Sequence, residues 1–91
     1  MADQLTLYYN NYWYQEDIEY LYLQLFSSLK KWNIQERIVG ADRECFRFSW
    51  QDSYYFTLNF DYYSQSCWIE GVDDKSISQV IYLHRALEVI T

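Results

Sequence analysis

The sequence has no proline and only two glycines among its 91 residues. Linkers and disordered tails are commonly rich in these residues, so neither is expected here over any length. The two cysteines, Cys45 and Cys67, are too few for a disulfide framework. Together with the one histidine they cannot complete a structural zinc site, which needs four ligands. The sequence therefore predicts no metal and no other cofactor.

Long apolar runs are also missing. No stretch approaches the roughly 20 apolar residues that a membrane-spanning helix needs. The first nine residues, MADQLTLYY, lack the basic and apolar segments of a signal peptide. We therefore expect a cytosolic protein that does not enter a membrane, and reduced thiols at Cys45 and Cys67 fit that compartment.

Positive charge is scarce, with 7 basic against 13 acidic side chains and a net charge of −6. The excess of acidic side chains is spread evenly along the chain. Residues 1–45 hold 4 basic and 7 acidic side chains, and residues 46–91 hold 3 and 6, so each part carries −3. Proteins that bind nucleic acid usually present a basic surface. Nucleic acid is therefore not expected as a partner.

Aromatic residues, in contrast, make up 22% of the chain, and 11 of them are tyrosines. A chain of this size buries only about 60 to 65% of its unfolded surface. Each buried ring removes about 150 to 250 Å² from water, so a few rings can close a small core. The sequence predicts one domain that spans residues 1–91.

The pattern of apolar residues predicts an α+β domain. We expect a mostly antiparallel sheet of four to five strands, in the order β-α-β-β-β-β-α, with both helices packed on one face. The expected strands cover residues 5–9, 36–39, 44–50, 54–60 and 66–70, and the expected helices cover about 14–32 and 74–90.

Both predicted helices carry an apolar stripe and end signals. In the first, acidic residues come early and Lys30 and Lys31 come last, which complements the helix dipole. Its stripe is Ile18, Leu21, Tyr22, Leu25, Leu29 and Trp32. In the second, Asp73 and Asp74 each offer an N-cap, and the segment SISQ at 76–79 matches a capping box. Its stripe is Ile77, Val80, Leu83, Leu87 and Ile90.

The segment WQDSYYFTLNF, residues 50–60, predicts a hairpin. The length of its loop decides whether the apolar side chains of the two strands share one face of the sheet. A two-residue loop would place the apolar sets of the two strands on opposite faces. A three-residue loop, residues 51–53, places them on the same face, so burial favours it. The pairs are then Trp50–Tyr54, Phe48–Phe56 and Phe46–Leu58. Such a loop usually needs a left-handed residue, here Asp52 or Ser53.

The other face of the central strands is expected to be polar, with Cys45, Arg47, Ser49, Tyr55, Thr57 and Asn59. The inward set of strand 66–70 stays open, because either Trp68 or the pair of Cys67 and Ile69 could point to the core. In both cases Cys45 and Cys67 are not expected to form a disulfide, since a strand separates them or they lie on opposite faces.

Side chains with catalytic potential lack the patterns that catalysis needs. His84 flanks the last apolar stripe, and no oriented partner is marked, so a half-buried structural histidine is favoured over a general base. Cys45 and Cys67 are interpreted as inert thiols, since neither lies in a Cys-x-x-Cys motif. Asp73 and Asp74 are interpreted as helix caps rather than metal ligands. We therefore predict no catalytic, cofactor-binding or metal-binding residue, and no enzyme.

Rings outside the predicted stripes exceed what one small core needs. Tyrosine is enriched at protein interfaces because it supplies contact area at low entropy cost. The candidate interface residues are Tyr12, Tyr14, Tyr20, Leu23, Tyr62, Tyr63 and Tyr82, and Tyr8 also falls outside the stripes. The alternative is that these rings simply lie flat on the surface.

The favoured function is a small, cytosolic, non-enzymatic protein that acts by binding another protein. It could be an adaptor, an inhibitor or an immunity-type protein, or it could form a homodimer. This hypothesis predicts that Tyr12, Tyr14, Tyr20 and Leu23 form one contiguous exposed patch.

Two alternatives carry their own geometric predictions. A small-molecule-binding or enzymatic domain would need a pocket that contains His84 and an acidic partner. A sheet that contacts RNA would need Arg43, Arg47 and Tyr55 clustered on its open face.

Overall fold

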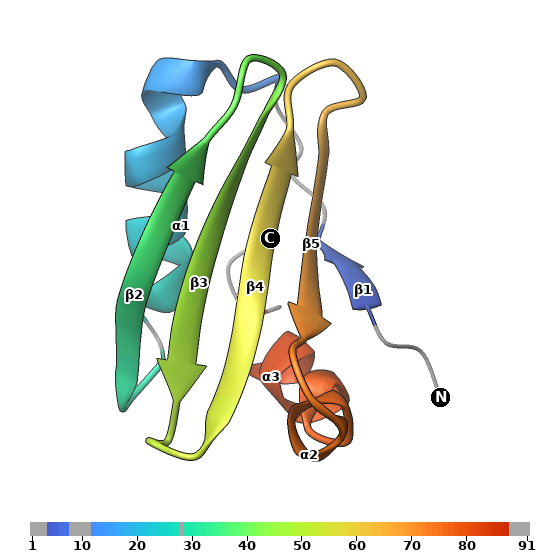
Figure 1. Ribbon diagram of the computed structural model, residues 1–91. Helices are drawn as coiled ribbons and strands as arrows, with labels where there is room; N and C mark the ends of the chain where they lie inside the picture. Colours follow the sequence, from blue (N-terminus) through green and yellow to red (C-terminus); the bar gives the residue numbers. More distant parts are fainter. Residues whose placement is uncertain (1–3, 8–11, 28, 88–91) are drawn as a thin grey trace.

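The structure, a computed structural model, describes residues 4–7, 12–27 and 29–87. Within these ranges the chain forms nine elements (Figure 1). They are β1 (Gln4–Leu7), the 3-10 helix η1 (Gln15–Asp17), α1 (Ile18–Phe26), β2 (Trp32–Val39), β3 (Arg43–Trp50), β4 (Tyr54–Asp61), β5 (Ser66–Gly71), α2 (Asp74–Ile77) and α3 (Val80–Leu87). The predicted α+β class is confirmed.

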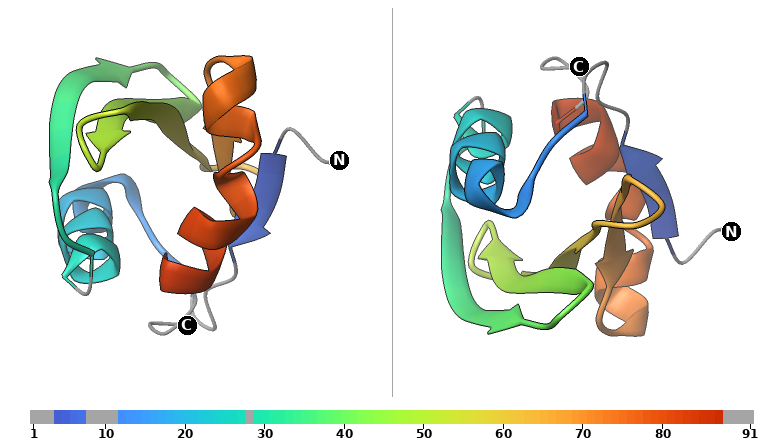
Figure 2. Two further views of the ribbon diagram at one scale, coloured as in Figure 1. Left: turned by 90° about the horizontal axis from the view of Figure 1, so that it is seen from below. Right: turned by 90° about the horizontal axis from the view of Figure 1, so that it is seen from above.

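The five strands form one antiparallel sheet in the order β1-β5-β4-β3-β2. Strands β2 to β5 are a meander, and β1 returns to pair with β5. Figure 2 shows that the sheet curves around α1 and α3, which lie on its concave side. The helix α2 lies at one end of β4 and β5. The described helices leave the convex face of the sheet uncovered in Figure 1.

The central hairpin has the register that burial predicts. Trp50 pairs with Tyr54, and Phe48 pairs with Phe56. The alternation along both strands then sends the apolar sets to the concave face, where their rings are buried. The fully buried members are Phe46, Phe48, Phe56, Leu58 and Phe60.

The loop of this hairpin differs in one detail from the prediction. Gln51 and Asp52 both have positive φ angles, 57° and 58°, whereas Ser53 does not. Asp52 was one of the two residues expected in the left-handed region, and Gln51 takes that conformation as well. Two successive left-handed residues turn the chain sharply enough for β4 to start directly after residue 53.

The concave face is filled by rings from α1 and from the sheet. The Phe26 ring of α1 lies with its centroid 4.8 Å from that of Phe48 and 4.9 Å from that of Trp32. On β5 the inward pair is Cys67 with Ile69, both buried, so the choice left open by the sequence is decided. The rings and branched side chains of both elements form one hydrophobic core.

The first helix is shorter than the predicted segment 14–32, which is a correction. The α-helix ends at Phe26, and Lys31 has a φ angle of 58°, so the chain turns before residue 32. Trp32 was expected on the helix stripe, but it begins β2 and pairs with Trp50. Strand β2 consequently starts four residues before the predicted 36, because pairing with β3 satisfies the Trp32 backbone and packs its partly buried ring against the core.

The last helix is divided, which is a second correction. Helix α2 ends at Ile77 and α3 begins at Val80. The predicted capping box at 76–79 does not form because Ser76 lies within α2, and its buried hydroxyl instead accepts a hydrogen bond from the Tyr55 backbone N–H, at 2.8 Å. Asp73 is the N-cap, as expected, and its carboxylate accepts from the Ser76 N–H at 2.8 Å. The predicted end of this helix, residues 88–90, lies outside the described residues.

Gly71 permits the close approach of α2 to β5. A Cβ atom at this position would lie 2.6 Å from the backbone nitrogen and 2.7 Å from the Cα atom of Ile77. Real Cβ contacts with backbone are essentially never this short. The end of β5 and the end of α2 therefore touch backbone to backbone.

Candidate functional site

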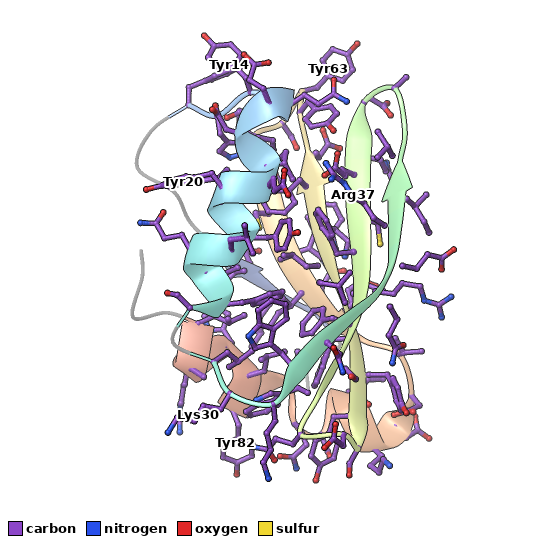
Figure 3. All side chains as sticks on the ribbon, turned by 90° about the vertical axis from the view of Figure 1, so that its left-hand side faces the viewer. Tyr14, Tyr20, Lys30, Arg37, Tyr63 and Tyr82 are labelled. Carbon is purple, nitrogen blue, oxygen red and sulfur yellow. The ribbon has the colours of Figure 1, made fainter. Side chains whose placement is uncertain are left out.

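Four of the predicted interface residues are exposed on α1 and on the segment that leads into η1. Tyr12, Tyr14, Tyr20 and Leu23 all keep about half or more of their surface in water, and Tyr20 is 67% exposed. They point outward because Ile18, Leu25 and Phe26 use the inner side of the helix. In Figure 3, Tyr14 lies at one end of the molecule and Tyr20 points away from the sheet.

Local bonds fix the start of this surface. The Tyr14 backbone N–H donates to the Asp17 carboxylate at 2.8 Å, and the Asp17 N–H donates to the Tyr14 carbonyl at 2.9 Å. The ring centroids of Tyr12 and Tyr14 lie 5.0 Å apart. On α1, Tyr20 and Leu23 are three residues apart and therefore neighbours on the helix surface. The two pairs flank one short helical stretch.

The charge of this stretch has one sign. The first basic residue in the chain is Lys30, so residues 1–29 contain only acidic charges. Glu16 and Glu19 are exposed beside the tyrosines, and Asp17 is partly exposed. We call the exposed residues Tyr12, Tyr14, Glu16, Glu19, Tyr20 and Leu23 the acidic aromatic surface.

The remaining interface candidates do not all share this location. Tyr63 is 86% exposed and lies at the same end of the molecule as Tyr14 in Figure 3, whereas Tyr82 is exposed at the opposite end. Tyr62 is only partly exposed, and its hydroxyl donates to the Glu44 carboxylate at 3.2 Å. Its ring packs on the buried Trp13, so the Tyr62 side chain lies against the core. Tyr8 lies outside the described residues.

A buried carboxylate, which the sequence analysis did not single out, lies on the concave face. Glu44 is 1% exposed and pairs with Arg37, whose Nη2 lies 3.0 Å from its Oε2. The Arg37 guanidinium also stacks over the Phe46 ring at 5.3 Å. Burial, followed by the Glu44 charge, raises the pKa of the Tyr62 hydroxyl. The alternation of ECFRFSW does place Glu44 on the side of Phe46, so this position was readable from the sequence.

The two cysteines are free and lie on opposite faces of the sheet. Cys45 is partly exposed on the convex face, and Cys67 is buried in the core. Burial raises the pKa of both thiols, most strongly that of Cys67, which disfavours the reactive thiolate. Neither environment is that of an activated nucleophile.

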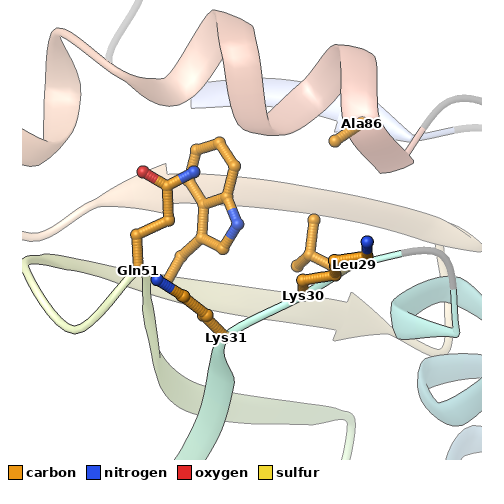
Figure 4. Close-up of a pocket in the computed structure, with 6 residues that line it drawn as sticks. Leu29, Lys30, Lys31, Gln51 and Ala86 are labelled. Atoms are coloured by element: carbon orange, nitrogen blue, oxygen red, sulfur yellow. The ribbon is translucent and has the colours of Figure 1, made fainter.

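His84 forms a hydrogen bond with the backbone of β1. Its Nε2 lies 2.8 Å from the Thr6 carbonyl oxygen, and since a carbonyl only accepts, this nitrogen carries the proton. Within the described residues, no carboxylate forms an ion pair with His84. The pocket seen in Figure 4 does not include His84 either, because it is lined by Leu29, Lys30, Lys31, Trp50, Gln51 and Ala86.

The residues considered for RNA contact lie on the convex face among acids. Arg47 forms an ion pair with Glu36 at 3.6 Å, and Arg43 is opposite Asp61 in the sheet. The exposed Tyr55 has the polar Ser49 opposite it. These residues therefore do not form a basic cluster.

Comparison with known proteins gives one match, to a family model described as "Protein of unknown function (DUF3630)" over residues 2–87. The chain belongs to this family. No curated protein and no solved structure matches it.

Two further properties concern the part of the chain that the structure describes. No helix there is both long enough and apolar enough to cross a bilayer. In the same residues, no three His, Cys, Asp or Glu side chains gather in a way that could hold a metal ion.

Proposed function

We propose that the protein acts in the cytosol by binding another protein through the acidic aromatic surface, and that this partner presents lysine or arginine side chains. One observation carries the proposal: exposed tyrosines and exposed carboxylates occur together between residues 12 and 23, in a region of the sequence with no basic residue. An adaptor, an inhibitor or an immunity-type protein would each work through such a surface.

The chemistry of the two residue types explains the choice of partner. A tyrosine ring attracts a cation over its face, by about 0.5 to 1 kcal/mol at an exposed site. Glu16 and Glu19 can accept charge-assisted hydrogen bonds, and arginine presents a planar fork that fits a carboxylate. Aromatic side chains and arginine are also the types enriched where proteins meet.

A second copy of the chain is a less favourable partner for this surface than a basic protein. A two-fold dimer through this surface would place the patch of both subunits, and therefore Glu16 and Glu19 of both copies, in one interface. Like charges brought together at an interface cost binding energy. The acidic aromatic surface therefore favours a different, basic protein over self-association.

The proposal can be tested by comparing two matched double variants in quantitative affinity capture from cytosol. Tyr14→Ser/Tyr20→Ser removes two rings from the surface. Tyr55→Ser/Tyr82→Ser removes two exposed rings elsewhere and serves as the control. We expect a partner that the wild type and the control retain and that the surface variant loses.

The partner identified in this way is then titrated as a pure protein. Glu16→Lys/Glu19→Lys is expected to weaken the Kd at least tenfold, and the wild-type affinity is expected to fall as salt rises, because exposed charges are screened. Equal binding by all variants would contradict the proposal. So would light scattering that shows a dimer disrupted by Tyr14→Ser/Tyr20→Ser.

A further inference from the structure

A pocket of about 590 Å³ opens between the α1–β2 connection, the β3–β4 loop and α3 (Figure 4). Its volume is within the range of roughly 300 to 1,000 Å³ that is typical of small-molecule sites. Trp50 lines it and is only 8% exposed, so its indole is held by the fold. Leu29 and Ala86 add further apolar surface. The wall of the pocket therefore suits a flat, apolar group.

The polar groups of the pocket are cationic. Lys30 and Lys31 both line it and are exposed. Neither forms an ion pair with any residue that the structure describes, whereas Arg37 and Arg47 are each paired with a glutamate. Two adjacent positive charges without an ion-pair partner among the described residues therefore lie at the opening of a concave site with apolar walls. They would attract an anionic group.

The backbone at the rim is strained. Four non-glycine residues in the described ranges have positive φ angles, and Lys31, Gln51 and Asp52 are three of them. The left-handed conformation costs such a residue about 1 to 2 kcal/mol. A hydrogen bond of 2.7 Å from the Gln51 N–H to the Lys31 carbonyl joins the two strained turns. Strain of this kind is concentrated at functional sites.

We propose that this pocket binds a small molecule that combines a planar ring with a carboxylate or phosphate group. The ring stacks against the Trp50 indole, and the anion lies between the ammonium groups of Lys30 and Lys31. The Gln51 amide can donate to or accept from a polar atom of the ligand. The site is separate from the acidic aromatic surface, so the two proposals stand or fall independently.

The first test asks whether ring and anion are both needed. The probes are matched pairs, indole-3-acetate against indole and adenosine 5′-monophosphate against adenosine, with inorganic phosphate alone as a fifth. Binding is followed through the indole N–H resonance of Trp50, which is assigned with a Trp50→Phe variant. We expect saturable shifts with at least one ring-bearing anion and at least tenfold weaker binding of its uncharged counterpart.

The second test asks whether Lys30 and Lys31 bind the anionic group of the ligand. Lys30→Gln/Lys31→Gln removes both charges and keeps similar chain length, and it is expected to weaken binding at least tenfold. Lys75→Gln is the control, because Lys75 stacks on Tyr54 and does not line the pocket. The proposal is overturned if no probe shifts the Trp50 resonance at 10 mM, a concentration that would reveal even a millimolar Kd. It is also overturned if the double variant binds as the wild type does.

Discussion

The two ends of the concave face differ in whether their charged side chains are buried and paired. At one end, Glu44 is fully buried and its carboxylate is shared between Arg37 and the Tyr62 hydroxyl. At the other end, Lys30 and Lys31 border a pocket and have no ionic partner among the described residues. In Figure 3, Arg37 lies toward the end marked by Tyr14 and Tyr63, and Lys30 lies toward the opposite end.

This difference distinguishes a charge that the fold requires from a charge that remains available to bind a ligand. A buried charge whose partner is removed is costly, so the end around Glu44 must stay intact for the fold. An exposed lysine without a partner contributes little to folding. Charges of the second kind can change without loss of stability, and for that reason they are free to serve a ligand. The four predictions below test this contrast, from the largest expected effect to the smallest.

Arg37→Ala should have the largest effect. It leaves the Glu44 carboxylate buried without its cation, although water can partly replace Arg37, whose side chain is 43% exposed. We expect the free energy of unfolding to fall by about 2 to 3 kcal/mol, measured by urea denaturation. The control is Arg47→Ala, which breaks an exposed pair and should cost less than about 0.5 kcal/mol. Equal losses for the two variants would contradict the contrast.

Tyr62→Phe removes one hydrogen bond to Glu44 and should cost about 1 kcal/mol at neutral pH. The pKa of Tyr62 is raised in the folded protein, so its neutral form stabilises the fold below the ordinary value of about 10. That contribution is lost as the pH rises through the folded-state pKa. The difference between wild type and Tyr62→Phe should therefore shrink above pH 10 in denaturation curves. Tyr63→Phe, at an exposed position, should show no such difference.

Gln51→Gly should act in the opposite direction. Glycine adopts a positive φ without steric cost, and this gain exceeds the added entropy of the unfolded chain. We expect a stabilisation of about 0.5 kcal/mol, seen as a higher midpoint in thermal unfolding. Ser53→Gly, at a residue of the same loop without positive φ, should be neutral or destabilising. A loss of stability in Gln51→Gly would show that the rim of the pocket is not strained.

Lys30→Gln should have the smallest effect, a change within about 0.5 kcal/mol in the same urea titration. Lys30 is exposed and forms no ion pair with a described residue. A marked loss of stability would place Lys30 among the structural charges and would remove the contrast between the two ends.

The sequence allowed the sheet to be predicted better than the helix ends. The strict alternation of β3 and β4, with a buried face to satisfy, left one acceptable hairpin register, and the structure has it. Trp32 was misassigned because its spacing fits the helix stripe, and only the pairing with Trp50 across the sheet shows that it belongs to a strand. Local spacing cannot reveal such a tertiary competition.

Of the two candidate sites, one could be predicted from the sequence and the other could not. The exposure of Tyr12, Tyr14, Tyr20 and Leu23 followed from their place off the helix stripe. The pocket did not follow, because its walls come from three separate parts of the chain and its rim depends on left-handed turns at residues other than glycine. No local pattern marks a serine such as Ser76 whose hydroxyl bonds the backbone of a distant strand.

The pairing of β1 with β5 has a consequence for the order of events as the chain folds. Leu7 lies opposite Cys67, and the His84 ring bonds the Thr6 carbonyl 78 positions away, so β1 completes its contacts only once β5 and α3 are in place. The meander β2 to β5 closes only short loops and can assemble beforehand. β1 is also an edge strand of the sheet, and its amides should be among the first to exchange with heavy water.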